Sequence, residues 1–144
     1  MDLLERARAL AACALFAELA PAVLIRLAER ARATDLEQGE RRTTDDTVWV
    51  VAKGSLAVIA RGEAAADSTA SSMKRVGGLA SAGHVVGLVR VVAPGTPVVE
   101  AVADRPTTVL ALTIDDMRDV LEEDPSALSA LAGALARLLL EGSP

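Results

Sequence analysis

The sequence predicts a mainly β domain with flanking helices: an eight-strand antiparallel β-roll or jelly roll, preceded by N-terminal helices and followed by two C-terminal helices. Apolar residues recur at helical spacing over about the first thirty residues. The chain then breaks into short β-branched runs separated by Gly, Pro and small polar residues, and helical spacing returns after Thr113. We therefore expect one domain over residues 1–144, with a helical segment at 1–33, the β-roll at 34–113 and the C-terminal helices at 114–141.

Two helices are expected at the N-terminus. The first has apolar residues at helical spacing from Leu3 to Ala14 and runs into the stretch that ends at Phe16. The second is predicted to begin at Pro21, because proline is favoured in a first turn, where its missing N–H has no helical partner. Its apolar face consists of Leu24, Leu27, Ala28 and Ala31.

The single cysteine, Cys13, has no partner for an internal disulfide. This usage is typical of a reducing compartment and indicates a cytoplasmic protein. We expect Cys13 to be a small apolar residue on a buried helix face.

The β-roll is predicted from runs of β-branched residues at the spacing of short strands. Six runs can be placed, at 48–51, 56–59, 73–79, 85–92, 98–102 and 107–112. Gly54 separates the first two runs, which alternate apolar and small residues as a hairpin requires. Gly54, Gly83 and Gly87 are expected at sharp corners of the roll, and residues 62–72 read as a surface loop.

Two helices are expected at the C-terminal end. Thr113, followed by Asp115 and Asp116, is typical of a helix N-cap with an acidic first turn, and this helix should stop before Pro125. The last helix, Ser126–Leu140, is apolar on nearly every side.

One face of a small β-roll can cover only about half of such a helix, and a helix that is apolar all round is normally buried. We therefore expect a partner protein or a second copy of the chain on this helix. The surface would be formed by Leu128, Leu131, Leu135 and Leu138, or by the opposing Ala130, Ala134 and Leu139. In the alternative interpretation, this alanine-rich surface is exposed to solvent and has no partner.

The composition argues against several functional classes. The 15 basic and 20 acidic side chains give a net charge of −5, and the chain has one Phe, one Trp and no Tyr, so nothing indicates nucleic-acid binding. No apolar run approaches the roughly 20 residues of a membrane span. The only histidine, His84, excludes a multi-histidine metal site, and no catalytic constellation is found, so neither an enzyme nor a metal site is expected.

Several segments resemble one known family in the same order along the chain. The stretch DTVWVVAKGSLAV at 46–58 resembles the motif D-x-x-Y-V-V-x-x-G-x-V of the cyclic-nucleotide-binding domain. Leu79 with GHVVG at 83–87 resembles the L-x-x-G-x-x-F-G start of its phosphate-binding cassette. The pair LF at 15–16 is similar to its helical segment, and TTVLAL at 107–112 to its closing strand.

This resemblance implies a ligand site between Gly87 and Val98 that departs from the family pattern. The family has a glutamate after the second glycine and an arginine about ten residues later, which hold the ribose hydroxyl and the cyclic phosphate. Here these positions fall on Leu88 and on Pro97 or Val98. Each lost charge-assisted hydrogen bond contributes roughly 1.5–3 kcal/mol, so the loss of both should weaken binding about a thousandfold.

The resemblance and the departure together predict a non-enzymatic regulatory or interaction module without strong cyclic AMP or cyclic GMP binding and without a cofactor. The cassette is expected to have collapsed or to be filled by apolar side chains. The alternative is a true sensor of a cyclic nucleotide or another small anion, built from Arg90 and the backbone amides of Leu88, Val89 and their neighbours. Arg90 can also be an exposed arginine, and His84 either a turn residue or a lone pH switch.

Members of this family often have a DNA-binding, kinase or channel domain beside the module. If the chain is whole, we expect no transcription factor, since residues 141–144 leave no room for a DNA-binding domain. If it belongs to a longer protein, the last helix is where we expect the neighbour to dock.

Overall fold

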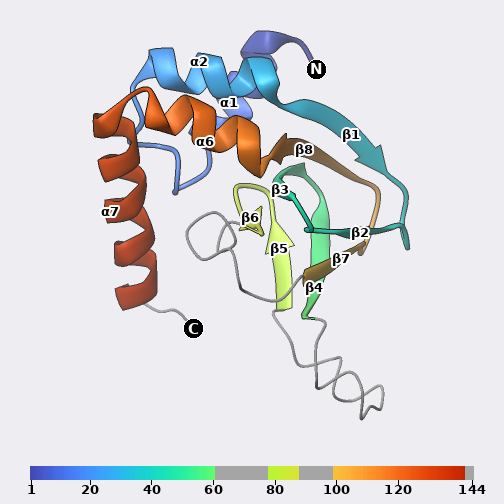
Figure 1. The fold of residues 1–144 in the computed structure, drawn as a ribbon. Coiled ribbons are helices and arrows are strands. Elements are labelled where there is room, and N and C mark those ends of the chain that lie inside the picture. The colour runs from blue at the N-terminus through green and yellow to red at the C-terminus, as the bar shows by residue number, and fades with distance from the viewer. Residues whose placement is uncertain (61–77, 88–98, 142–144) are drawn as a thin grey trace.

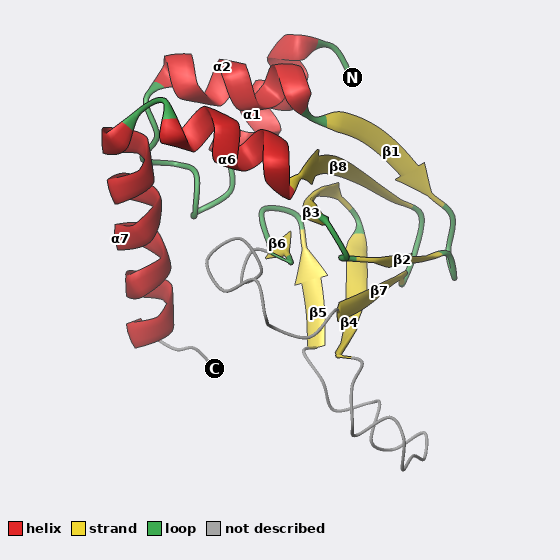
Figure 2. Cartoon of the chain, viewed as in Figure 1, coloured by secondary structure: helices red, strands yellow, loops and turns green. Residues whose placement is uncertain are grey.

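The computed structural model describes residues 1–60, 78–87 and 99–141, except the side chains of residues 60, 138, 139 and 141 (Figure 1). Two helices lead into the β-roll, and two more follow it (Figure 2). Among the described residues, the helices in chain order are α1 (Leu3–Ala11), α2 (Pro21–Arg30), α6 (Ile114–Glu122) and α7 (Pro125–Glu141). The strands are β1 (Arg32–Leu36), β2 (Arg41–Thr43), β3 (Thr47–Lys53), β4 (Ser55–Ala60), β5 (Gly78–Ser81), β6 (Val85–Val86), β7 (Val99–Ala103) and β8 (Thr107–Thr113).

The eight strands form two four-stranded antiparallel sheets, as the predicted β-roll requires. One sheet has the order β1-β8-β3-β6 and the other β2-β7-β4-β5. Their facing sides enclose one cluster of buried residues: Leu36, Trp49, Val51, Leu56, Ala80, Val86, Ala101, Ala103 and Val109. Apart from β4 and β5, which pair with each other, consecutive strands belong to opposite sheets around a single interior.

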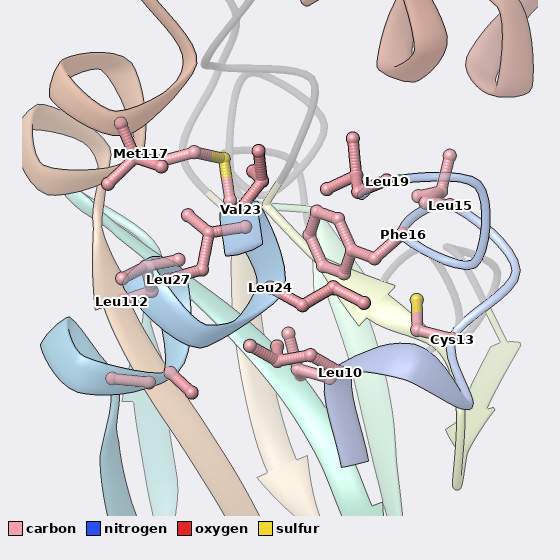
Figure 3. Packing of buried hydrophobic residues seen from close by; sticks show 14 of the residues in the cluster. Leu10, Cys13, Leu15, Phe16, Leu19, Val23, Leu24, Leu27, Leu112 and Met117 are labelled. Carbon is pink, nitrogen blue, oxygen red and sulfur yellow. The ribbon is translucent and has the colours of Figure 1, made fainter. Parts of the chain in front are cut away.

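The first sheet has a second buried face, which is covered by the helices. Along β3 the side chains alternate: Trp49 and Val51 belong to the interior of the roll, whereas Val48 and Val50 belong to the cluster under the helices. Figure 3 shows that cluster, where Phe16 and residues of α2 pack with Met117 of α6. Most of the large buried side chains lie in this layer, so the helices are integral to the core.

Three local predictions about the helices are confirmed. α2 begins at Pro21, and its predicted apolar face is buried. The Oγ1 of Thr113 accepts a hydrogen bond from the backbone N–H of Asp116 at 3.1 Å, which caps α6. α6 ends before Pro125, and α7 follows immediately.

The predicted hairpin around Gly54 is wrong. β3 pairs with β6 and β8, whereas β4 pairs with β5 and β7, so the two strands that flank Gly54 lie in different sheets. Gly54 has φ +92°, and the chain turns there from one sheet into the other. The corner-glycine interpretation is therefore confirmed, and the pairing of the flanking strands is corrected.

Two boundaries also differ from the prediction. α1 ends at Ala11 rather than continuing to Phe16, so Cys13 lies in the turns between α1 and α2. β6 ends at Val86, because Gly87 adopts φ +93°, outside the range of a strand. The predicted loop at 62–72 and residues 88–92 of the predicted long strand lie outside the described residues.

Candidate functional site

A cavity of about 470 Å³ opens beside the β-roll, between segments that are distant in sequence. Its described lining comes from the turn after α1, from β4, from the segment β5 to Gly87 and from β7. These residues are Cys13, Ala14, Leu15, Val58, Leu79, Ala80, Gly83, His84, Val85, Val86, Gly87 and Val99. The volume lies in the range of small-molecule pockets in proteins.

One side of the cavity is shaped by the tight turn Ser81–His84. The backbone N–H of His84 donates to the carbonyl oxygen of Ser81 at 2.9 Å, and Gly83 in the turn has φ +93°. The N–H of Gly83 donates to the carbonyl oxygen of Val51, and the N–H of Val51 donates to that of His84. The turn is thus anchored to β3 by backbone hydrogen bonds on both sides.

The His84 side chain makes a further contact with the same turn. Its Nδ1 accepts a hydrogen bond from the backbone N–H of Ser81 at 2.9 Å. In the neutral imidazole the proton is therefore on Nε2, because an acceptor nitrogen carries none. His84 is exposed, as expected for a turn residue.

Gly87 closes the described lining where β6 ends. A Cβ placed there would lie 3.1 Å from the side chain of Thr44 and from the carbonyl oxygen of Thr47, tighter than nine in ten real Cβ contacts. The left-handed φ favours glycine, and the close approach leaves little room for a side chain. Gly87 therefore has a packing role regardless of any ligand.

Cys13 reaches the cavity from the helical layer. Its side chain is 1% exposed and belongs to the core, which confirms its predicted burial. Burial raises the pKa of the Cys13 thiol, partly offset by hydrogen bonds from the backbone of Leu15 and Phe16. The neutral thiol is a small apolar group at neutral pH rather than a nucleophile.

The described lining is mainly aliphatic. Apart from Cys13, its only titratable side chain is that of His84, and it contains no Arg, Lys, Asp or Glu. Among the described residues there is also no group of three or more His, Cys, Asp and Glu that could hold a metal ion. Over this part of its wall, the cavity offers mainly dispersion contacts, together with the imidazole of His84.

The six predicted cassette residues divide at Gly87. Gly87 lines the cavity, whereas Leu88, Val89, Arg90, Pro97 and Val98 lie outside the described residues. The predicted collapse of the cassette concerns that same segment and stays a prediction.

The predicted interaction residues lie on α7, and Leu128, Leu131 and Leu135 are not part of the described cavity lining. Leu128 is 48% exposed, Leu135 is half-buried, and Leu131 packs into the protein's own core with 3% exposed. The side chain of Leu138 is not described. Figure 1 shows α7 leaving the helical layer and running down beside the roll.

Sequence reasoning missed most of the cavity lining. Val58 and Val99 had no local signal beyond membership of a strand, and Cys13 and Leu15 were assigned to a helix. These residues form one wall only because the turn after α1 lies against the roll. Leu79 had a usable signal, since it stands just before the glycine-bounded turn of the motif.

We compared the sequence and the fold with those of known proteins. No protein-family model matches the sequence, and no curated protein matches it. Solved structures do match. The N-terminal domain of a transcriptional regulator from Streptomyces coelicolor superposes with a TM-score of 0.68 at 21% identity, over 98% of this chain and 94% of that one.

Two regulatory chains of protein kinase A also match. The regulatory domain from Toxoplasma gondii, solved with cyclic AMP, gives a TM-score of 0.74 at 12% identity, over 97% of this chain and 50% of that one. The regulatory subunit of a cAMP-independent protein kinase A from Trypanosoma brucei gives 0.71 at 17% identity, over 94% of this chain and 47% of that one. This chain thus spans about half the length of the kinase regulatory chains.

The chain has the fold of a cyclic-nucleotide-binding domain. The predicted resemblance is thereby confirmed at the level of fold, since the identities of these matches are all below 25%. No helix in the described part of this cyclic-nucleotide-binding fold is long and apolar enough to cross a membrane.

Proposed function

We propose that the chain is a non-enzymatic regulatory module of the cyclic-nucleotide-binding type that acts through protein contacts and does not bind cyclic AMP or cyclic GMP strongly. The observation that carries this proposal is the aliphatic character of the described cavity wall, which contains no arginine or lysine. A cyclic phosphate that leaves water must regain strong hydrogen bonds from a cation or from oriented N–H groups. The sequence adds that Leu88 and Pro97 stand where the family has its glutamate and arginine.

The matched structures support a regulatory role with or without the nucleotide. One kinase regulatory chain of this fold was solved with cyclic AMP, and another belongs to a kinase described as cAMP-independent. The fold therefore serves regulation in both situations. The single, buried cysteine further supports action in a reducing compartment, the cytoplasm.

Calorimetric titration with cyclic AMP and cyclic GMP tests the first part of the proposal. We expect dissociation constants weaker than about 100 μM, given the two lost charge-assisted hydrogen bonds. The variant Leu88→Glu with Pro97→Arg restores both side chains and should bind more tightly by an order of magnitude or more. Its two single variants are the matched controls.

Binding by the unmodified chain tighter than about 100 μM would contradict the proposal and favour the alternative sensor. In that case Arg90→Ala should abolish binding, because Arg90 is the cation within the cassette segment. The two readings thus make opposite predictions for the same titration.

The protein contacts are assigned to α7, and the partner to a second copy of this chain. Four residues spaced four apart form one exposed apolar stripe, the α7 stripe: Leu128, Ala132, Ala136 and Leu140. The predicted interface also included Leu131 and Leu135, of which Leu131 is occupied by the protein's own core. The proposed interface therefore keeps Leu128 but follows the exposed face of α7 instead of the face that includes Leu131.

The charge distribution favours a second copy. Within residues 126–140 the only charged side chain is that of Arg137, and it is paired with Glu18 on the turns before α2. Two α7 stripes can therefore meet across a twofold axis without apposing like charges, and the small Ala132 and Ala136 allow close approach of the helices. An apolar stripe of this kind is complementary to itself.

Sedimentation velocity over micromolar to millimolar concentrations tests the second part. We expect the chain to dimerise with rising concentration and Leu128→Glu with Ala132→Glu to stay monomeric, because two carboxylates per copy would be buried. Leu79→Glu is the matched control, since Leu79 is 59% exposed and lies on β5, away from the stripe. A monomer at all concentrations would contradict self-association.

A further inference from the structure

We propose that the cavity beside the β-roll binds a small, uncharged and mainly apolar molecule with one hydrogen-bond acceptor. This inference rests on the proposed function, because it names the class of ligand that the regulatory module would sense in place of a cyclic nucleotide. The argument uses only the described lining of the cavity, from the turn after α1, β4, the segment 78–87 and β7.

The first step is the chemical character of the wall. Aliphatic side chains come from each of the four segments, for example Leu15, Val58, Val86 and Val99. An ion placed against such a wall loses its hydration without compensation, whereas an apolar molecule gains contacts and releases water. The described wall therefore selects against charge.

The second step is the exposure of Leu79. This side chain lines the cavity and is 59% exposed, whereas the neighbouring Ala80 is buried in the roll. An exposed leucine at the edge of a ligand-sized cavity gives an apolar molecule a surface to cover. Covering it removes apolar surface from water and favours binding.

The third step is the imidazole of His84. His84 lines the cavity, and its Nδ1 accepts from the N–H of Ser81, which in the neutral ring leaves the proton on Nε2. No hydrogen bond joins Nε2 to another described residue. In that tautomer Nε2 can donate to a carbonyl or ether oxygen of the ligand.

The chain contains its own reporter for this experiment. Trp49 is the only tryptophan, there is no tyrosine, and Trp49 is the register partner of the cavity residue Val86 in the β3–β6 pair. Energy transfer from Trp49 to a bound dye therefore reports binding, and a variant in the cavity lining assigns the binding to this site.

The experiment uses N-phenyl-1-naphthylamine, an uncharged apolar dye, with the full chain. We expect saturable binding at one site, with energy transfer from Trp49 to the dye. Leu79→Glu should raise the dissociation constant about tenfold or more, because the carboxylate would be desolvated by the dye. Leu4→Glu, at a matched leucine on α1 that is 56% exposed and lies outside the described lining, should leave binding unchanged.

The role of His84 is tested by competition between two ligands of similar shape, 2-acetylnaphthalene and 2-ethylnaphthalene. The ketone should bind more tightly than the hydrocarbon, and His84→Ala should reduce this preference several-fold, as expected for one hydrogen bond. In that variant the turn keeps the hydrogen bond from the backbone N–H of residue 84 to the carbonyl oxygen of Ser81. A general distortion of the cavity would weaken both ligands equally and leave their ratio unchanged.

The outcomes separate this inference from the proposed function. Absence of saturable dye binding, equal binding by Leu79→Glu, or an unchanged ketone preference in His84→Ala would overturn the inference, even if cyclic nucleotides bind weakly as proposed. Strong cyclic AMP binding that leaves dye binding intact would overturn the proposed function but not the apolar site. Displacement of the dye by micromolar cyclic AMP would overturn both.

Discussion

The Oγ1 of Thr107 lies 2.5 Å from the position that a Cβ on Gly54 would occupy. The same oxygen accepts a hydrogen bond from the N–H of Ser55 at 3.1 Å and lies 3.0 Å from the Ser55 carbonyl oxygen, to which it can donate. The corner between β3 and β4 is therefore in close contact with the start of β8. This contact lies where the chain passes from one sheet of the roll to the other.

Gly54→Ala should destabilise the protein more than Gly39→Ala. Both glycines have φ near +91°, so both variants carry the cost of a left-handed alanine, about 1–2 kcal/mol. Only at Gly54 would the new methyl group meet backbone atoms of Pro106 and Thr107 within 2.9 Å, whereas Gly39 faces open space. Urea denaturation measures both losses. Equal losses would show that the corner relaxes without cost.

Thr107→Val should lower the free energy of unfolding by about 1–3 kcal/mol, because the Ser55 N–H would lose its partner in a buried place. Thr108→Val is the neighbouring control, since its hydroxyl donates to the Asp35 carboxylate at an exposed position. That variant should cost less than about 1 kcal/mol. If Thr107→Val unfolded at the same urea concentration as the unmodified chain, the buried hydrogen bonds would not contribute to stability.

Thr113→Ala should cost about 1 kcal/mol by removing the N-cap of α6. Thr113→Ser keeps a hydroxyl that can accept from the Asp116 N–H, so it should restore most of the loss. Thermal unfolding followed by circular dichroism compares the three proteins. An equal loss in both variants would assign the effect to the threonine methyl group instead of the cap.

Stability should fall at alkaline pH partly through Cys13. Burial raises the pKa of its thiol, so the folded chain keeps this proton at a pH where the unfolded chain has lost it. The unfolded state then binds fewer protons, and the free energy of unfolding decreases as pH rises above the ordinary thiol pKa of about 8.5.

Urea denaturation at about pH 7 and about pH 10 tests this linkage with Cys13→Ala as the control. The alanine variant should lose less stability between the two values than the unmodified chain. An identical loss in both proteins would place the alkaline sensitivity in other groups.

Local signals predicted the start of α2 and both ends of α6, but not the end of α1. Pro21 and the Thr113 cap act through neighbouring backbone atoms, so their effect can be derived from a few consecutive residues. Strands with polar composition were harder to place. Arg41–Thr43 forms β2 because it pairs with β7, and no alternation within three residues could indicate that partner.

The candidate site was predictable only where it coincides with a glycine motif. Gly83 and Gly87 stand out in the sequence because a turn and a close approach require them, and both line the cavity. Val58 and Val99 look like any strand valine. Their place at the cavity depends on how two sheets close, which is set by contacts between distant residues.

The sequence by itself determined the order of helices and roll, the start of α2, the Thr113 cap and the corner glycines, because these depend on backbone preferences of nearby residues. The tertiary structure decided that Gly54 joins two sheets and that Leu131 belongs to the core. It also brought Cys13, Val58 and Leu79 around one cavity. The reason is physical: strand pairing and burial are shared between distant segments, so no short stretch of sequence specifies them alone.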